Sequence, residues 1–278
     1  MWDIDLTYRQ GFIATFRRLY EKLELLNKAR PLPQAAVNKI KEALTIEWTY
    51  NSNSIEGNTL SLRETQMVLQ DGITVKGKSL REHFEAKNHE KAIELLFNFV
   101  SDGKLLSETV LLSLHAMVLR AIEDDFAGRL RNGSVRIAGA NFIPPNAAKV
   151  PFLLRELVNF VNENPLQLNE IEMAAVFHHK FVWVHPFFDG NGRTVRLAMN
   201  LILMKRGFPP AIILKNDRKK YYDALNQANK GSYEKLILLV CQAVERTLNI
   251  YLGVLPNQGE DYDLIQNIVE EPGFPYSQ

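Results

Sequence analysis

The segment from His185 to Arg193, His-Pro-Phe-Phe-Asp-Gly-Asn-Gly-Arg, brings an imidazole, a carboxylate, a carboxamide and a guanidinium close together. A second guanidinium, Arg196, follows three residues later, and an apolar run predicts a helix that begins near Gly192. The free N–H groups and the dipole at a helix N-terminus attract anions, and glycines let an anion approach the backbone closely. A base, a metal-binding carboxylate and two arginines around such a pocket indicate phosphoryl or nucleotidyl transfer.

The same string resembles the signature of the Fic family, His-x-Phe-x-(Asp/Glu)-Gly-Asn-Gly-Arg-x-x-Arg, and matches it at every position. The resemblance implies an enzyme that transfers AMP from ATP to a Ser, Thr or Tyr hydroxyl group of a target protein, or of itself, and releases pyrophosphate. It implies that His185 is the general base and that Asp189 binds Mg²⁺, with ATP as co-substrate. The phosphate contacts would come from Gly190, Asn191, Gly192, Arg193 and Arg196, and Phe187 would anchor the loop in the core.

A second pattern, Ser-x-x-x-Glu-Gly, is formed by Ser52, Glu56 and Gly57. Taken alone, it indicates the C-terminal end of a helix with Gly57 just beyond it. It also resembles the Fic inhibitory motif, (Ser/Thr)-x-x-x-Glu-(Gly/Asn). The resemblance implies that Glu56 forms two parallel hydrogen bonds with Arg196, and thereby competes with the γ-phosphate of ATP and leaves the α-phosphate badly aligned.

Nucleoside contacts and target docking are implied by two further segments. One face of a helix expected over residues 217–230 is either a half-buried stripe or a nucleoside-binding surface. Residues 134–143 predict a small β-hairpin that matches the family's flap, along which a target segment would pair through its main chain. The residues implied are Tyr221, Tyr222 and Asn229 for the nucleoside, and Ile137, Ala138, Gly139 and Ala140 for the flap.

Helical periodicity dominates the rest of the chain, so the expected fold class is all-α, a Fic-type helical bundle with one β-hairpin. Pro186 should end the helix that precedes it and place His185 where helix gives way to loop. Three regions are expected: an N-terminal helical region (1–100), a catalytic core (101–252), and a polar tail (253–278). The family resemblance allows a C-terminal winged-helix module to start in this tail. The predicted helices cover residues 8–28, 34–51, 61–70, 79–102, 107–121, 151–162, 170–184, 192–207, 217–230 and 232–252.

Composition limits the partners and the compartment. The formal net charge of +1 gives no basic field for nucleic acid, so such a partner is expected only through a further C-terminal module. The single cysteine, Cys241, lies in an apolar run and predicts a buried thiol. No apolar stretch reaches membrane-spanning length and no secretory signal begins the chain, so a cytoplasmic protein is expected. Zinc is not expected at His178 and His179, and a homodimer remains open.

Three functions remain open at this stage. The first is an autoinhibited protein adenylyltransferase. The second is an enzyme that removes AMP from a modified protein, with Glu56 positioning water. The third is a nucleotide-sensing regulatory module that binds ATP without efficient turnover; the presence of His185 favours an enzyme, because a sensor has no use for a general base.

Overall fold

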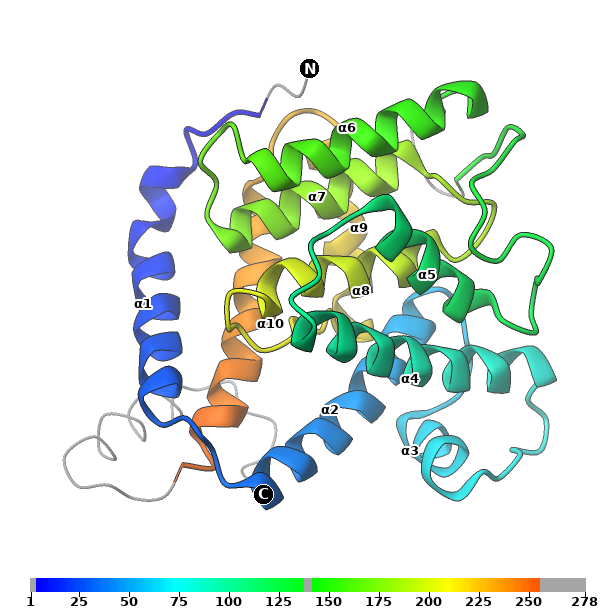
Figure 1. Ribbon diagram of the computed structural model, residues 1–278, viewed down its shortest axis with the longest axis horizontal. Coiled ribbons are helices and arrows are strands. Elements are labelled where there is room, and N and C mark those ends of the chain that lie inside the picture. Colours follow the sequence, from blue (N-terminus) through cyan, green and yellow to red (C-terminus); the bar gives the residue numbers. More distant parts are fainter. Residues whose placement is uncertain (1–3, 138–141, 256–278) are drawn as a thin grey trace.

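The computed structural model describes residues 4–137 and 142–255, and all regular secondary structure in these residues is helical (Figure 1). The all-α class is therefore confirmed. The helices are α1 (Arg9–Lys28), α2 (Gln34–Ile55), α3 (Leu62–Gln66), the π-helix η1 (Met67–Asp71), α4 (Leu80–Ser101), α5 (Glu108–Leu119), η2 (Ala147–Lys149), α6 (Val150–Glu163), α7 (Glu170–Val184), α8 (Asn191–Met204), η3 (Lys215–Asp217), α9 (Arg218–Ala228) and α10 (Glu234–Leu252).

The centre of the bundle is the pair α7 and α8, which pack against each other. Most residues of both helices are buried, as expected of helices that are surrounded by others. Phe177 and Phe181 of α7 and Leu197 and Leu201 of α8 are completely buried. The short loop between the two helices, residues 185–190, is the segment with the signature, so the core fixes both of its ends.

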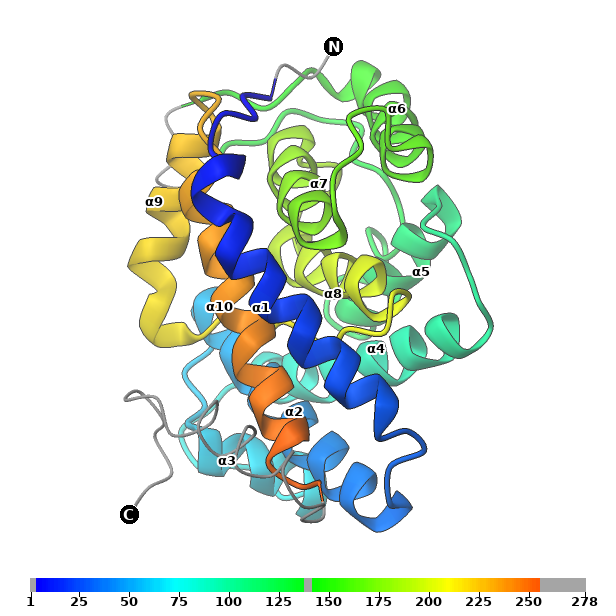
Figure 2. The ribbon, with the colours of Figure 1, turned by 90° about the vertical axis from the view of Figure 1, so that its left-hand side faces the viewer.

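Other helices cover this pair on two sides. On one side α1 and α10 lie against each other, which both views show (Figure 1, Figure 2). On the other side α2 and α4 pack on α8, and α5 packs on α4 and α8. This second arrangement brings the C-terminal end of α2 and the N-terminal turn of α4 to the start of α8.

Local capping explains where several helices begin. Ser61 with Glu64, Ser79 with Glu82, and Asn169 with Glu172 each form a capping box, in which two free N–H groups are satisfied reciprocally. The expected single helix over residues 61–70 is instead an α-helical turn that continues as the π-helix η1.

The second helix is longer than its apolar pattern predicts. It continues to Ile55, so that Ser52 lies in its last turn and Glu56 is its C-cap residue. The extra turn is buried, with Ser52, Asn53 and Ile55 almost inaccessible to solvent, because it packs at the start of α8. Tertiary packing thus extends the helix beyond its amphipathic stretch.

The β-hairpin is not seen in the described part of the flap. Residues 134–137 and 142–143 have irregular backbone, and Ala138, Gly139, Ala140 and Asn141 lie outside the described residues. The predicted tail module also falls almost entirely outside them, on residues 256–278. Among the described helices, none combines the length and the apolar character needed to cross a bilayer. The division at residues 100 and 101 stays a prediction.

Candidate active site

His185 terminates α7 in a left-handed conformation. Its φ is +49°, which is uncommon for a residue with a side chain, and its N–H donates to the carbonyl of Phe181 at 2.9 Å. Pro186 follows and cannot continue the helix. The left-handed turn therefore places the imidazole at the junction between α7 and the loop, as the sequence predicts.

The His185 side chain is prepared to accept a proton. Nδ1 lies 3.4 Å from the carbonyl oxygen of Val182, and because a carbonyl only accepts hydrogen bonds, this contact favours the tautomer with the proton on Nδ1. Nε2 then carries the free lone pair. Burial lowers the pKa of His185 to about 4, so the ring is neutral near pH 7. A neutral imidazole with a free Nε2 is the form that a general base requires.

Arg131 fixes the backbone around His185. Its Nε donates to the carbonyl of His185 at 2.7 Å, and its Nη1 donates to the carbonyl of Gly133 at 2.9 Å. Its Nη2 donates to the carbonyls of Pro145 and Val184. The guanidinium is buried and its pKa is lowered by that burial. One side chain thus ties both ends of the 134–143 segment to the residue that bears the candidate base.

Asn191 and Phe187 close the loop that leads into α8. The amide of Asn191 donates to the carbonyl of Phe187 at 2.9 Å and accepts from the N–H of Phe187 at 3.0 Å. Phe187 is completely buried, as predicted, and its ring stacks on His115 with centroids 3.6 Å apart. The Asn191 side chain is therefore engaged in shaping the loop, and its backbone N–H is the group that remains for an anion.

His115 also supports the loop from α5. Its Nδ1 accepts from the N–H of Gly128, so its Nε2 carries the proton and donates to the carbonyl of Asp189 at 3.0 Å. Gly190 follows with φ of +73°, and a Cβ there would lie 3.3 Å from the His115 ring. Only glycine combines this conformation with this close packing.

The N-terminal turn of α8 faces the loop with free N–H groups and two arginines. The first N–H groups of a helix have no partner within the helix and attract anions, together with the helix dipole. Arg193 and Arg196 lie in the first two turns, and each is only 2% exposed. The structure thus brings Gly190, Asn191, Gly192, Arg193 and Arg196 together, as the sequence predicts.

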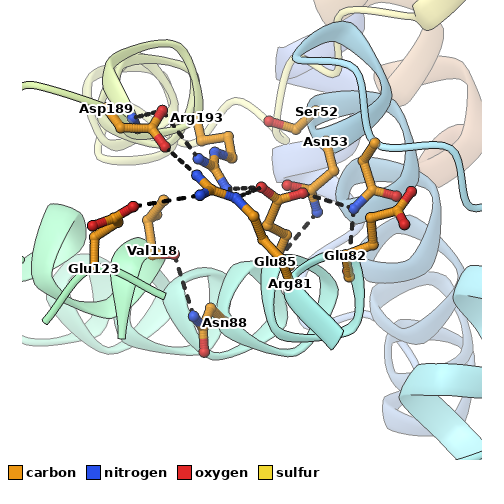
Figure 3. Close-up of polar contacts among 12 residues, drawn as sticks. Ser52, Asn53, Arg81, Glu82, Glu85, Asn88, Val118, Glu123, Asp189 and Arg193 are labelled. Atoms are coloured by element: carbon orange, nitrogen blue, oxygen red, sulfur yellow. Dashed lines mark hydrogen bonds and ion pairs between the residues drawn. The ribbon is translucent and has the colours of Figure 1, made fainter. Parts of the chain in front are cut away.

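Asp189 lies between two guanidinium groups. Its Oδ2 is 2.6 Å from Nη2 of Arg81, and its Oδ1 is 3.5 Å from Nη2 of Arg193 (Figure 3). Oδ1 also accepts from the N–H of Gly190. Burial raises the pKa of Asp189, but Arg193, the Gly190 N–H and Arg81 outweigh this and keep its pKa below the usual value. An ionised, half-exposed carboxylate is a donor that Mg²⁺ accepts, with phosphate oxygens and water completing its shell.

Glu56 and Ser52 share the guanidinium of Arg196. Oε1 of Glu56 lies 2.8 Å from Nη1 of Arg196 as an ion pair. Nε of Arg196 donates to the Ser52 hydroxyl at 3.0 Å, and Nη2 donates to the Ser52 carbonyl at 2.7 Å. The expected pairing of Glu56 with Arg196 is present, but the expected fork of two parallel bonds is not, because Ser52 takes the other two nitrogens.

The Glu56 carboxylate also rests against the backbone of α8. A Cβ placed on Gly192 would overlap Oε1 of Glu56 and lie 3.0 Å from Nη1 of Arg196. The missing side chain at Gly192 therefore lets the carboxylate reach the first turn of the helix, where an anion is favoured. Gly57 follows Glu56 with φ of +105°, a conformation that suits glycine and ends α2.

The nucleoside candidates differ in their surroundings. Tyr221 is buried and its hydroxyl lies 3.1 Å from Nε2 of His178. Tyr222 is half-buried, and its ring lies under the guanidinium of Arg218 at 4.9 Å. Asn229 ends α9, and its Oδ1 lies 2.9 Å from Nε2 of His179. Of the two tyrosines, Tyr222 has the more accessible side chain, and Asn229 is exposed.

A zinc site is not formed in the described residues. No group of three or more His, Cys, Asp or Glu residues among them is arranged to bind a metal ion. His178 and His179 point to different partners, Tyr221 and Tyr233, and burial lowers the pKa of both. Cys241 is a buried free thiol, as predicted.

Four residues of the site have no signal in the sequence motifs. Arg131 and His115 hold the loop, while Arg81 and Glu85 contact Asp189 and Arg193 from α4. Glu85 and Arg81 are four residues apart, and the sequence pattern suggests only an ordinary surface pair at that spacing. Their role becomes visible only when α4 packs on α8.

Comparison with known proteins places these features in a family. Residues 105–203 match the model of the Fic/DOC family. "Protein adenylyltransferase Fic" from Culex quinquefasciatus is 36% identical over 239 residues, which are 85% of this chain and 47% of that protein. The protein of the same name from Nematostella vectensis is 38% identical over 220 residues, 77% of this chain and 50% of that protein. The chain thus spans about half the length of the curated relatives it matches.

Two solved structures resemble most of this chain. Fic-1 from C. elegans is 33% identical with a TM-score of 0.78, over 89% of this chain and 74% of that one. A Fic domain containing signaling protein from Bacteroides thetaiotaomicron is 25% identical with a TM-score of 0.74, over 86% of this chain and 98% of that one. The similarity therefore extends well beyond the segment that the family model matches.

Proposed function

This chain belongs to the Fic/DOC family, and from that premise we propose that it transfers AMP from ATP to a hydroxyl group of a protein. The observation that carries the proposal is the position of His185. A neutral imidazole with a free Nε2 sits on the same short loop as the anion-attracting start of α8. The name protein adenylyltransferase, borne by the curated relatives, supports the same reaction.

In the proposed reaction the hydroxyl oxygen of the target attacks the α-phosphorus of ATP. The proton of that hydroxyl passes to Nε2 of His185, and the bond from the α-phosphorus to the bridging oxygen breaks. The electron pair leaves with pyrophosphate. General base assistance of this kind contributes roughly 10²–10⁴-fold to the rate.

The start of α8 supplies the phosphate contacts in this proposal. Asn191 and the N–H groups of Gly190, Gly192 and Arg193 would receive the α-phosphate and the charge that develops on it. Arg193 would bind the β-phosphate of the leaving group. Arg196 would bind the γ-phosphate, in the place where the Glu56 carboxylate now lies.

Asp189 is the residue that would bind Mg²⁺. When bound, the ion would neutralise charge on the phosphates of ATP and bridge them to the protein. The residues fit such a group because Asp189 is ionised and its Oδ2 already faces a cation, the guanidinium of Arg81. The chain itself contributes one carboxylate, consistent with the preference of Mg²⁺ for phosphate and water as its other ligands.

Autoinhibition by Glu56 is part of the proposal. The carboxylate and a γ-phosphate are both anions that require Arg196, so they exclude one another. Glu56 is 35% exposed and sits at the end of a helix, which makes its displacement feasible. While it is in place, the triphosphate would bind with its α-phosphate out of line, and misplacement by ~1 Å costs on the order of 10²-fold.

The partner surfaces are proposed from the family pattern. Segment 134–143 would align the target through main-chain pairing, and Arg131 holds Gly133 and Pro145 on either side of it. Tyr222 would contact the nucleoside; Tyr221, Asn229 and the flap residues Ile137, Ala138, Gly139 and Ala140 remain proposed contacts of the same kind. We keep the cytoplasm as the proposed compartment, because the one thiol is a buried, free cysteine.

One substitution tests the reaction. The test is made in a Glu56→Gly protein, in which Arg196 is free, with ATP labelled in the α-phosphate. In this protein His185→Ala should reduce AMP transfer by at least about 10²-fold. The affinity for ATP should be unchanged in calorimetry, because the base acts on the hydroxyl. Undiminished labelling by a folded His185→Ala protein would overturn the assignment.

Removal of AMP from a modified protein is a second candidate, favoured by one observation. The Glu56 carboxylate is partly exposed and lies beside Gly192, where it could orient a water molecule toward a bound α-phosphate. If this direction dominates, the wild-type protein should release AMP from a self-modified Glu56→Gly protein. Release by Glu56→Gln at the same rate would argue against it.

A further inference from the structure

The N-terminal turn of α4 reaches into the phosphate-binding face of α8. Glu85, the sixth residue of α4, places Oε1 3.3 Å from Nη1 of Arg193 (Figure 3). Both side chains are withdrawn from solvent, with Glu85 14% and Arg193 3% exposed. A charge pair in this setting is screened far less than a surface pair, so its geometry matters for both partners.

Glu85 is itself fixed on three sides. Its Oε2 accepts from the amide of Asn58 at 2.8 Å, and its Oε1 accepts from Nε of Arg81 at 3.3 Å. The carbonyl of Glu85 accepts from the amide of Asn53, at the end of α2. The carboxylate therefore has one oxygen directed at Arg193 and the other tied to the segment that follows Glu56.

Arg193 has few other restraints. Its Nη2 lies 3.5 Å from Oδ1 of Asp189, which is at the limit of a hydrogen bond. Its Nε and Nη1 are buried and make no hydrogen bond within the described residues. Nη1 has the ion pair with Glu85, whereas Nε has no partner among the described residues. A buried donor without a partner is a group that a phosphate oxygen would satisfy, so the guanidinium is oriented but not saturated.

On this geometry we propose that Glu85 is a positioning residue for Arg193. It holds Nη1 of the guanidinium at the start of α8 so that the unpartnered Nε is ready for the β-phosphate, and Asn58 links that position to the segment carrying Glu56. The inference rests on the proposed function, because it assigns Glu85 to the same reaction. It adds a contact from α4, outside both sequence motifs.

Glu85 is proposed to position Arg193, whereas Glu56 is proposed to compete with a phosphate for Arg196. The two carboxylates differ in exposure and in how firmly they are held. Glu56 is 35% exposed at a helix terminus, whereas Glu85 is 14% exposed within a helix and bonded to its neighbours. A carboxylate so restrained does not leave when ATP binds. It engages only Nη1 of Arg193 and leaves the other nitrogens to the nucleotide.

The test compares Glu85→Gln with Glu94→Gln in a Glu56→Gly protein. Glu94 lies on the same helix, is half exposed and pairs with Lys91, so it is a matched control. The Nε–H signal of Arg193 in nitrogen–proton correlation spectra, identified by its loss in Arg193→Lys, reports how firmly the guanidinium is held. ATP affinity is measured by calorimetry and turnover by labelling from α-labelled ATP.

The proposal expects the Arg193 signal to broaden or exchange faster in Glu85→Gln, with the Arg196 signal unchanged. Turnover should fall about tenfold, because the guanidinium of Arg193 is then less well placed. The affinity for ATP should not weaken, because the substitution removes a negative charge beside the phosphates. Asn58→Asp, which loses the amide donor, should shift the Arg193 signal in the same direction. Glu94→Gln should change none of these.

Three results would overturn the proposal. An unchanged Arg193 signal would mean that Glu85 does not hold it, and a rise in turnover would mean that Glu85 competes with the nucleotide. A loss of ATP affinity that accounts for the whole change in rate would also contradict a positioning role. If the Glu56→Gly protein transfers no AMP at all, the proposed function fails, and the Arg193 signal still decides the role of Glu85.

Discussion

Oε1 of Glu56 lies 2.8 Å from Nη1 of Arg196, and the pair joins the end of α2 to the second turn of α8. Ser52 binds the other two nitrogens of the same guanidinium. Arg196 is almost completely buried, so loss of Glu56 would leave a charge held only by neutral groups until an anion arrives. In the proposed reaction, the Glu56 carboxylate therefore occupies the place of a phosphate.

Acid should destabilise this fold through its histidines. Burial is the main cause that lowers the pKa of His115, His179 and His185 to about 4, from 6.5 in the unfolded chain. As the pH falls, these histidines bind protons in the unfolded state before they do so in the folded state. The free energy of unfolding is therefore at its full value above pH 6.5 and decreases as the pH falls toward 4. Each unit of difference in pKa is worth about 1.4 kcal/mol.

Urea denaturation at intervals between pH 7.5 and pH 4.5 measures this dependence. The free energy of unfolding should fall steadily below pH 6.5, and His115→Gln should flatten part of the slope. A free energy of unfolding that is constant over this range would show that these imidazoles are not buried in the neutral form.

Arg131 should be essential for the loop that carries His185. Arg131→Met keeps much of the volume but removes donors to the carbonyls of His185, Gly133 and Pro145. Leaving buried carbonyls without partners should lower the free energy of unfolding by about 3 kcal/mol and reduce AMP transfer with it. Arg129→Met, at an exposed position nearby, is the control; equal effects from the two variants would show that Arg131 contributes only its charge.

Arg81 should compete with Mg²⁺ for Asp189. Its guanidinium lies 2.6 Å from Oδ2, but both side chains are nearly half exposed, so the pair is weak. Arg81→Ala should therefore lower the Mg²⁺ concentration at half-saturation of ATP binding by up to about fivefold, consistent with ~1 kcal/mol for an exposed pair. Calorimetry at fixed ATP measures it, and Lys91→Ala should have no effect. A higher half-saturation would mean that Arg81 assists the metal instead.

The residues proposed to carry the chemistry could be predicted from the sequence more fully than the residues that hold them in place. The positions of His185, Asp189 and Arg193 follow from one contiguous motif, because a proline, two glycines and an apolar helix fix the loop locally. The Glu56–Arg196 contact spans 140 residues, and it was predicted only because Ser52–Gly57 resembles a known pattern. Nothing in the local sequence predicted that Ser52 would occupy two of the three guanidinium nitrogens.

The residues that support the loop could not be predicted for a physical reason. Arg131 lies in an aperiodic segment and Glu85 on a helix face rich in charge, where a solvated side chain is the usual expectation. Their partners are carbonyls and side chains brought close by packing of α4, α5 and α7 around α8. The extension of α2 to Ile55 has the same origin, because tertiary contacts with α8 override the end of its apolar pattern.

The most direct test of the account is AMP transfer by Glu56→Gly compared with wild type, using ATP labelled in the α-phosphate and Mg²⁺. If the inhibited arrangement is preferred by about 2.8 kcal/mol, labelling should rise about 100-fold when Glu56 is removed. Glu56→Gln should rise less, Glu42→Gln on the same helix should not rise, and adding Arg196→Ala to Glu56→Gly should abolish most of the gain. Equal labelling by folded wild-type and Glu56→Gly proteins would contradict the account, because the pair with Arg196 would then only cap a helix.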